Sequence, residues 1–228
     1  GRAPDALYTR PLFESRRRVL ESGAYAPVVE ALSRLVARYA PDDALLVDAG
    51  CGEGFYAKAL AAQFRRVVAF DLARDAVYLA ASGPKDERAQ RVTFLVADLT
   101  RIPVQDGAAS VLLDVFTPAH YAEFARVLKP GGVLIKALPG PGYLREIRAL
   151  AGQRDYRNDD VLRRLDETGG ERFLPLARET LCYTFPLPEP LRTDAVRMTP
   201  LTHAHAASPD ALTEITIEME IAVLGKRE

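Results

Sequence analysis

The spacing of apolar positions changes after the first forty residues of the chain. Before that point apolar side chains recur about every 3.6 residues, which predicts a helix over Pro11–Glu21 and another that Pro27 opens. Ser22-Gly23 separates the two helices. Beyond them, short apolar runs of strand length end at polar or turn residues. We therefore predict an N-terminal helical segment over residues 1–40 and a second unit over residues 41–228.

Strand and helix patterns alternate through the second unit. This alternation is typical of repeated βα units, so we predict an α/β fold with a doubly wound, mostly parallel sheet of seven strands. The last two strands are expected to pair antiparallel. The predicted strands are Ala44–Val47, Val67–Phe70, Val92–Val96, Val111–Phe116, Val133–Leu138, Glu179–Pro186 and Leu212–Leu224. The predicted helices are Phe55–Phe64, Ala73–Ala81, Ala119–Leu128 and Leu191–Met198, with a charged helix or surface excursion at Gln153–Gly170.

Composition narrows the class of protein. The 30 basic and 31 acidic residues nearly cancel, which excludes a strongly polycationic protein but not a local basic patch. With only Cys51, Cys182 and three histidines, no zinc spacing and no disulfide framework can be drawn, and a reducing cytoplasm is the expected compartment. The longest apolar stretches are of strand length and no signal-peptide pattern is present, so we expect no membrane span.

A glycine-rich turn, Gly50–Gly54, joins the first predicted strand to the helix after it. Such a turn needs glycine because it is tight and because a ligand must approach the backbone closely. Glycine-rich turns also serve nicotinamide and flavin cofactors. Three features favour S-adenosylmethionine instead: the spacing is Gly-x-Gly-x-Gly, Asp48 ends the strand before it, and Asp71 and Asp98 end the next two strands.

The three aspartates should meet at the carboxyl edge of a parallel sheet, where such folds bind ligands. There Asp71 would accept hydrogen bonds from the ribose hydroxyls, Asp98 would accept one from the adenine amine, and Asp48 would lie beside the methionyl part. A single aspartate at a strand end is usually a cap or turn residue, so this interpretation depends on all three. Cys51 is interpreted as a small packing residue of the loop rather than a nucleophile.

Segments along nearly the whole chain carry a family resemblance: Phe13 with Arg16–Arg18, Ser22–Pro27, Asp48–Tyr56, Val115–Pro118, Glu123–Gly132, Pro139–Pro141 and Met198–Pro200. They resemble the bacterial large-subunit ribosomal RNA guanine-N1 methyltransferases, including the branch that confers macrolide resistance. The resemblance implies a class I methyltransferase that uses S-adenosylmethionine, acts on ribosomal RNA and forms a homodimer. It also implies a small four-ligand zinc domain ahead of the methyltransferase part, and this chain begins just after the place where that domain would end.

The expected acceptor site lies after the fourth strand, where methyltransferases place their substrate. Phe116 would stack on a base or pack under the cofactor. His120, Glu123, His203 and His205 are polar candidates whose alternative is an exposed surface role, and no catalytic base is assigned. The residues predicted to bind the cofactor are Tyr25, Asp48, Gly50, Cys51, Gly52, Gly54, Asp71, Leu72, Asp98, Leu99 and Phe116. Those predicted to contact the acceptor are Thr117, Pro118, His120 and His203.

Arg10 and the run Arg16–Arg18 are candidates for contacts with RNA phosphates, with charged surface as the alternative. The three consecutive arginines span most of a helical turn, so they cannot all face one way.

The leading hypothesis is methyl transfer to N1 of a guanine in large-subunit ribosomal RNA. One rival is a methyltransferase of a small metabolite. Another is a module that binds the cofactor without catalysis, against which the intact Gly50–Gly54 loop and the three strand-end acids argue.

Overall fold

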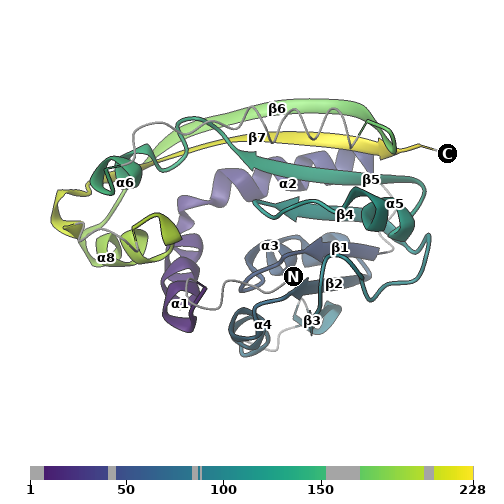
Figure 1. Cartoon of the computed structure of the whole chain (residues 1–228), viewed down its shortest axis with the longest axis horizontal. Coiled ribbons are helices and arrows are strands. Elements are labelled where there is room, and N and C mark those ends of the chain that lie inside the picture. Colours follow the sequence, from purple (N-terminus) through teal and green to yellow (C-terminus); the bar gives the residue numbers. More distant parts are fainter. Residues whose placement is uncertain are drawn as a thin grey trace.

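In the computed structural model, helices and strands alternate along the chain as the sequence predicts (Figure 1). The structure describes residues 8–40, 45–83, 87, 89–152, 170–202 and 208–227. The strands are β1 (Leu45–Ala49), β2 (Arg66–Asp71), β3 (Val92–Val96), β4 (Ala109–Val115), β5 (Leu128–Pro139), β6 (Phe173–Pro186) and β7 (Glu214–Lys226). The α-helices are α1 (Arg10–Val19), α2 (Ala26–Tyr39), α3 (Phe55–Leu60), α4 (Arg74–Ala81), α5 (Tyr121–Val127), α6 (Arg145–Leu150) and α8 (Glu189–Arg197).

The strands form one seven-stranded sheet in the order β3-β2-β1-β4-β5-β7-β6. Strands β1 to β5 run parallel to one another, whereas β7 runs antiparallel to both β5 and β6. This arrangement confirms the predicted mostly parallel sheet with a final antiparallel pair. The strand order reverses between β1 and β4, and the loops that leave a sheet at such a point diverge to form a crevice at its carboxyl edge.

Both faces of the sheet are covered, which explains why its inner strands are apolar almost throughout. Neighbouring side chains of a strand point to opposite faces. Leu46 thus packs in the same buried cluster as residues of α2 and α3, whereas Val47 packs in the cluster that contains residues of α5. Figure 1 shows α2 behind the sheet and α5 in front of it. Helices on both faces confirm the predicted doubly wound architecture.

Several elements differ from the sequence prediction. The helix predicted over Ala119–Leu128 ends at Val127, and β5 begins at Leu128 rather than at Val133, because the pairing with β4 shifts at a bulge and Leu128 already pairs with Ala109. Strand β6 begins at Phe173 rather than at Glu179. The helix predicted over Phe55–Phe64 ends at Leu60 and continues only as a short 3₁₀ turn. Helix α6 was not predicted, because six residues are too few to show a helical period. The predicted excursion at 153–169 lies outside the described residues.

The break predicted at Ser22-Gly23 is present as a kink. A π-helical turn, η1 (Leu20–Ala24), connects α1 to α2, and Gly23 has a non-helical backbone there with a φ of 96°. Glycine adopts this conformation without steric cost, so the chain changes direction between the two helices. Within the described residues, no helix has the length and apolar character needed to cross a membrane.

Helices α1, α6 and α8 gather at one end of the sheet, on the left of Figure 1. Helix α1 is fixed to α8 although the two are far apart in the sequence. Arg18 Nε donates to Asp194 Oδ2 at 2.6 Å, and the buried hydroxyl of Ser15 donates to Asp194 Oδ1 at 3.0 Å. The N-terminal helix is therefore placed over the carboxyl edge of the sheet, where the crevice opens.

Candidate functional site

The glycine-rich loop adopts a backbone conformation that requires glycine at three positions. Gly50, Gly52 and Gly54 have φ values of 77°, 54° and 77°, in the region that favours glycine. A Cβ on Gly50 would collide with the side chain of Thr117, and one on Gly52 would collide with the guanidinium of Arg16. The loop is therefore enclosed by the turn after β4 on one side and by α1 on the other.

A cavity of about 560 Å³ opens at this edge of the sheet. It is bordered by the ends of β1, β2, β3 and β4, by α1, by the turn after β5 and by the segment after α8. Most of the predicted site residues line it: Tyr25, Asp48, Gly50, Cys51, Asp71, Leu72, Asp98, Leu99, Phe116, Thr117 and Pro118. Gly52 and Gly54 belong to the same loop but are not among the lining residues. His203 and His205 lie outside the described residues.

Asp71 fixes the shape of the cavity wall through both of its carboxylate oxygens. The backbone N–H of Gly52 donates to Oδ2 at 2.9 Å, and that of Ala73 donates to Oδ1 at 2.8 Å. Each carboxylate oxygen can accept more than one hydrogen bond. Asp71 can therefore hold the glycine loop and still accept hydroxyl donors from a ligand.

Asp48 is a buried acid at the cavity with an unsatisfied oxygen. Its exposed fraction is 2%, and within the described part of the chain Oδ2 has no hydrogen-bond partner. Burial, followed by the charge of Asp71, raises the pKa of Asp48 to about 8, against the opposing backbone N–H of Ala57. A buried oxygen without a partner is costly. The site is thus prepared for a ligand that brings a donor or a positive charge.

Asp98 is held at the end of β3 by the residue two positions later. The backbone N–H and the hydroxyl of Thr100 both donate to its Oδ1, at 2.8 and 2.9 Å. The backbone donor is the main cause of a lowered pKa for Asp98, so the group is an anion at neutral pH. Leu72, which is 43% exposed, and Leu99 provide apolar surface in the same part of the cavity.

Arg16 is a cavity residue, which sequence reasoning did not recognise. Its Nη2 lies 2.6 Å from Glu53 Oε2 and its Nε 2.9 Å from the same oxygen, and Glu53 is 3% exposed. Its guanidinium also lies 5.0 Å from the ring centroid of Phe13. Residues one apart on a helix differ by about 100° in direction. Arg17 accordingly pairs with Glu21.

The three consecutive arginines diverge, as their helical spacing predicts. They pair with three different acids, Arg16 with Glu53 in the glycine loop and Arg18 with Asp194 on α8. Arg10 pairs with Glu14 one turn along its own helix. A contact of these arginines with RNA phosphates stays a prediction.

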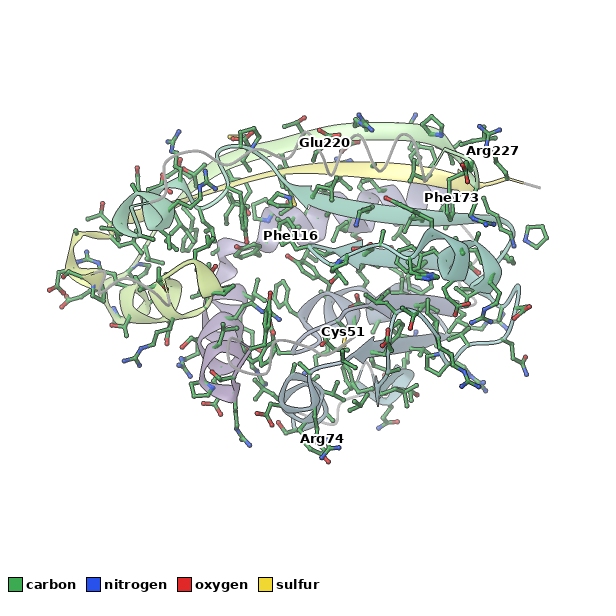
Figure 2. The ribbon with its side chains drawn as sticks, viewed as in Figure 1. Cys51, Arg74, Phe116, Phe173, Glu220 and Arg227 are labelled. Atoms are coloured by element: carbon green, nitrogen blue, oxygen red, sulfur yellow. The ribbon has the colours of Figure 1, made fainter. Side chains whose placement is uncertain are left out.

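An aromatic wall closes the side of the cavity next to β4 and β5. Phe116 and Tyr143 lie with ring centroids 4.8 Å apart at 51°. The hydroxyl of Tyr143 is 2.7 Å from that of Tyr25, a residue only 1% exposed. Figure 2 shows Phe116 beyond the end of β4, toward α1 and α8. Tyr143 was not predicted, because the turn that carries it has no chemical signature in the sequence.

His120 and Glu123 stabilise α5. His120 Nδ1 accepts from the backbone N–H of Glu123 at 3.3 Å, which caps the helix. Glu123 pairs with Arg126 and accepts from the backbone N–H of Ile102 at 2.8 Å. Neither is among the residues that line the cavity, so a contact of His120 with an acceptor stays a prediction without support from this geometry.

Cys51 is buried beside the glycine loop, and burial is the main cause of the strongly raised pKa of its thiol. The thiol form is not nucleophilic. This is consistent with its interpretation as a packing residue.

The sequence and the fold match known methyltransferases. Residues 46–132 match the model of a methyltransferase domain. The 23S rRNA (guanine(748)-N(1))-methyltransferase of Streptomyces fradiae is 32% identical over 80% of this chain and 65% of its own length. A Micromonospora griseorubida protein, provisionally named for the same type of activity, is 30% identical over 87% of this chain and 75% of its own length. The chain belongs to the 23S rRNA guanine-N1 methyltransferase family.

The chain spans less than two thirds of the length of two curated relatives that it matches. The Bacillus subtilis (strain 168) relative is 33% identical over 69% of this chain, but the match covers 58% of that protein. Methyltransferases of other acceptors match as well, among them a malonyl-[acyl-carrier protein] O-methyltransferase of Serratia marcescens, 31% identical over 65% of this chain. Among solved structures, the YcgJ protein of Bacillus subtilis shares the fold, with a TM-score of 0.61 at 14% identity over 88% of this chain and 97% of that one.

Proposed function

We propose that this chain transfers a methyl group from S-adenosylmethionine to N1 of a guanine in 23S ribosomal RNA. The observation that carries the proposal is the resemblance to 23S rRNA guanine-N1 methyltransferases over 80–87% of the chain. The cavity at the carboxyl edge of the sheet supports it, because it joins the strand-end acids to an aromatic wall.

The residues of the cavity fit the parts of S-adenosylmethionine. Asp71 keeps acceptor capacity for the ribose hydroxyls, and Asp98 for the adenine amine. The unsatisfied Oδ2 of Asp48 suits the ammonium of the methionyl part. When bound, the cofactor supplies a methyl group on a sulfonium, which an acceptor nitrogen can attack.

The acceptor would enter beside the aromatic wall. Phe116 offers a ring on which a base can stack, a contact worth about 1–3 kcal/mol. A guanine in a duplex is out of reach, so the base has to be unpaired or flipped before N1 can meet the methyl group. Holding the two reactants in line supplies much of the rate acceleration.

We also propose that the N-terminal helical segment, described from residue 8 to residue 40, covers the cofactor cavity. Tyr8, Phe13 and Arg16 of this segment line the cavity. The division of the chain at residue 40, the cytoplasmic location and the homodimer that the family resemblance implies stay predictions. Sedimentation velocity of the purified chain tests the homodimer.

The test of function is methyl transfer from labelled S-adenosylmethionine to unmodified 23S rRNA, followed by nucleoside analysis. Label in 1-methylguanosine is the expected result. Label in another nucleoside would contradict the assignment of N1 of guanine. Absence of label, with cofactor binding intact, would favour the metabolite methyltransferase, provided that the same result is obtained when the N-terminal zinc domain that the family resemblance implies is joined to this chain.

Arg16 carries the only positive charge among the described residues that line the cavity. We expect its Nη1 to bind the carboxylate of the cofactor. Arg16→Met should then weaken S-adenosylmethionine binding by about 10- to 100-fold, the worth of a charge-assisted hydrogen bond. Isothermal titration calorimetry with 5′-methylthioadenosine, which lacks the carboxylate, should show no such loss.

Arg17→Met is the matched control, because Arg17 lies on the same helix but pairs with Glu21 away from the cavity. Arg16→Met leaves the buried Glu53 without its cation and so lowers stability. The double variant Arg16→Met/Glu53→Gln should recover thermal stability without recovering affinity. Equal losses for both ligands would show that Arg16 acts through the loop and not on the carboxylate.

A further inference from the structure

A buried ion pair lies directly beneath the turn that carries Phe116. Asp114 on β4 and Lys136 on β5 are register partners, and Lys136 Nζ donates to Asp114 Oδ2 at 2.7 Å. Their side chains are 0% and 2% exposed. Burying two charges costs the hydration of both, and apolar residues of similar volume often stabilise a core as well or better. Stability alone therefore does not explain the pair.

Both members of the pair also bind the backbone of the turn. The backbone N–H of Thr117 donates to Asp114 Oδ1 at 3.3 Å, and Lys136 Nζ donates to the carbonyl of Thr117 at 3.0 Å. The N–H of Phe116 donates to the carbonyl of Ala137 at 3.0 Å. The turn is thus held from below at three points, two of which the ion pair provides.

The turn needs these contacts because its conformation is strained. Phe116 has a φ of 58°, a left-handed conformation that bulky residues rarely adopt. Such strain persists only where the surroundings over-determine it, and it is concentrated at functional sites. Without the hydrogen bonds to Thr117, the backbone of Phe116 would relax to an unstrained conformation and its ring would move away from Tyr143.

The position of that ring matters because of what it touches. Phe116 and Tyr143 form one aromatic surface on the cavity, with ring centroids 4.8 Å apart. Tyr143 is itself fixed, since its hydroxyl is 2.7 Å from that of Tyr25 and its carbonyl accepts from Arg148 Nη1. A displaced Phe116 would therefore break the surface on which a planar acceptor can stack.

We propose that the Asp114–Lys136 pair is a positioning device for methyl transfer, which holds Phe116 in its strained conformation so that an aromatic acceptor stacks in line with the methyl donor. The inference rests on the proposed function of the cavity. Asp114 and Lys136 are not among the residues that line it, so they act through the turn and do not touch the reacting atoms.

Two double variants separate the hydrogen bonds of the pair from its charges. Asp114→Leu/Lys136→Met keeps the volume and removes every bond to Thr117, whereas Asp114→Asn/Lys136→Gln is neutral but retains an acceptor and a donor for it. We expect kcat for methyl transfer to 23S rRNA to fall about 10- to 100-fold in the first variant, because a small displacement of the acceptor from its reactive position costs a factor of this size. The second variant should stay within about 3-fold of the wild type, with kcat measured at saturating cofactor in both.

A wild-type kcat in Asp114→Leu/Lys136→Met would overturn the proposal. So would equal losses in the two double variants, since the charge and not the bonds to the turn would then matter. Glu123→Gln/Arg126→Met serves as control, because it removes an ion pair of α5 that is not part of the cavity. It should lower the melting temperature and leave kcat unchanged.

A second measurement needs neither RNA nor turnover. The chain contains no tryptophan, so Phe116→Trp introduces a single indole at the turn, which can be excited at wavelengths that its nine tyrosines do not absorb. The anisotropy decay of the single variant Phe116→Trp should show an immobile indole. The indole should stay immobile when Asp114→Asn/Lys136→Gln is added to this variant, and it should become mobile when Asp114→Leu/Lys136→Met is added instead. A fixed indole in all three would overturn the inference, whatever the acceptor. If the indole becomes mobile in Asp114→Leu/Lys136→Met but the wild-type protein does not methylate 23S rRNA, the positioning role is retained and the proposed function is refuted.

Discussion

Replacing Asp71 by Ala should weaken S-adenosylmethionine binding by about 100-fold or more. Asp71 receives the N–H groups of Gly52 and Ala73, and we propose that it also receives the ribose hydroxyls. Hydrogen bonds to a charged group are worth about 1.5–3 kcal/mol each, so the loss of two gives a factor of this size. The measurement is the dissociation constant from isothermal titration calorimetry.

Asp75→Ala is the control for this substitution, since Asp75 is an exposed acid four residues later and is not among the cavity-lining residues. It should leave cofactor affinity unchanged. Thermal unfolding of Asp71→Ala shows how much of the loss comes from a loosened glycine loop. Unchanged affinity in a folded Asp71→Ala would refute the placement of the ribose.

Cofactor binding should strengthen as the pH rises from 6 to 8, by as much as about 10-fold per pH unit. The pKa of Asp48 in the free protein is raised to about 8, mainly by burial, so its carboxyl holds a proton over most of this range. A cationic group of the ligand favours the carboxylate and lowers that pKa. Binding then releases a proton, which low pH opposes, and the dependence levels off above about pH 8.

Asp48→Asn should remove this dependence. The amino group of the ligand also titrates near this range, but equally in both proteins, so the ratio of the two dissociation constants isolates Asp48. The ratio should favour the wild type more strongly at pH 8 than at pH 6. A constant ratio would show that no positive group of the ligand meets Asp48.

The same substitution should stabilise the protein in the absence of ligand. The pKa of Asp48 lies above its unfolded value of 3.8, so the folded state holds a proton that the unfolded state has lost between about pH 4 and 8. Stability therefore falls as the pH rises through this window, and Asn escapes that loss. Each kcal/mol recovered raises the melting temperature by about 2–4 °C in a chain of this size. No gain at pH 8 relative to pH 5 would contradict the buried, protonated state.

At Asp48, the stability of the ligand-free protein and its affinity for the cofactor would then have opposite requirements. An acid with an unsatisfied buried oxygen costs free energy until a ligand provides the missing partner. The cofactor would repay that cost on binding, so Asp48→Asn is expected to be more stable and to bind more weakly. The strained backbone of Phe116 is a second feature of the same cavity that lowers stability, and the Asp114–Lys136 pair holds it in place.

The apolar runs determined the sheet because their signal is local. A strand buried on both faces needs apolar side chains on both, so the run that forms β4, buried throughout, could be located to within two residues. The convergence of Asp48, Asp71 and Asp98 also followed, since the carboxyl ends of neighbouring parallel strands share one edge. The proposed acceptor rests on the family resemblance, because no spacing of residues encodes it.

Only the tertiary structure decided which charges meet. Arg16 and Glu53 are 37 positions apart and Arg18 and Asp194 are 176 apart, so no periodic pattern links them. The direction of each side chain depends on how α1 docks against α8 and the glycine loop. The pairing of Asp114 with Lys136 likewise depends on the register of β4 against β5. Local sequence determines the elements because the apolar period of each one lies within a short stretch of chain, whereas a site depends on how those elements pack.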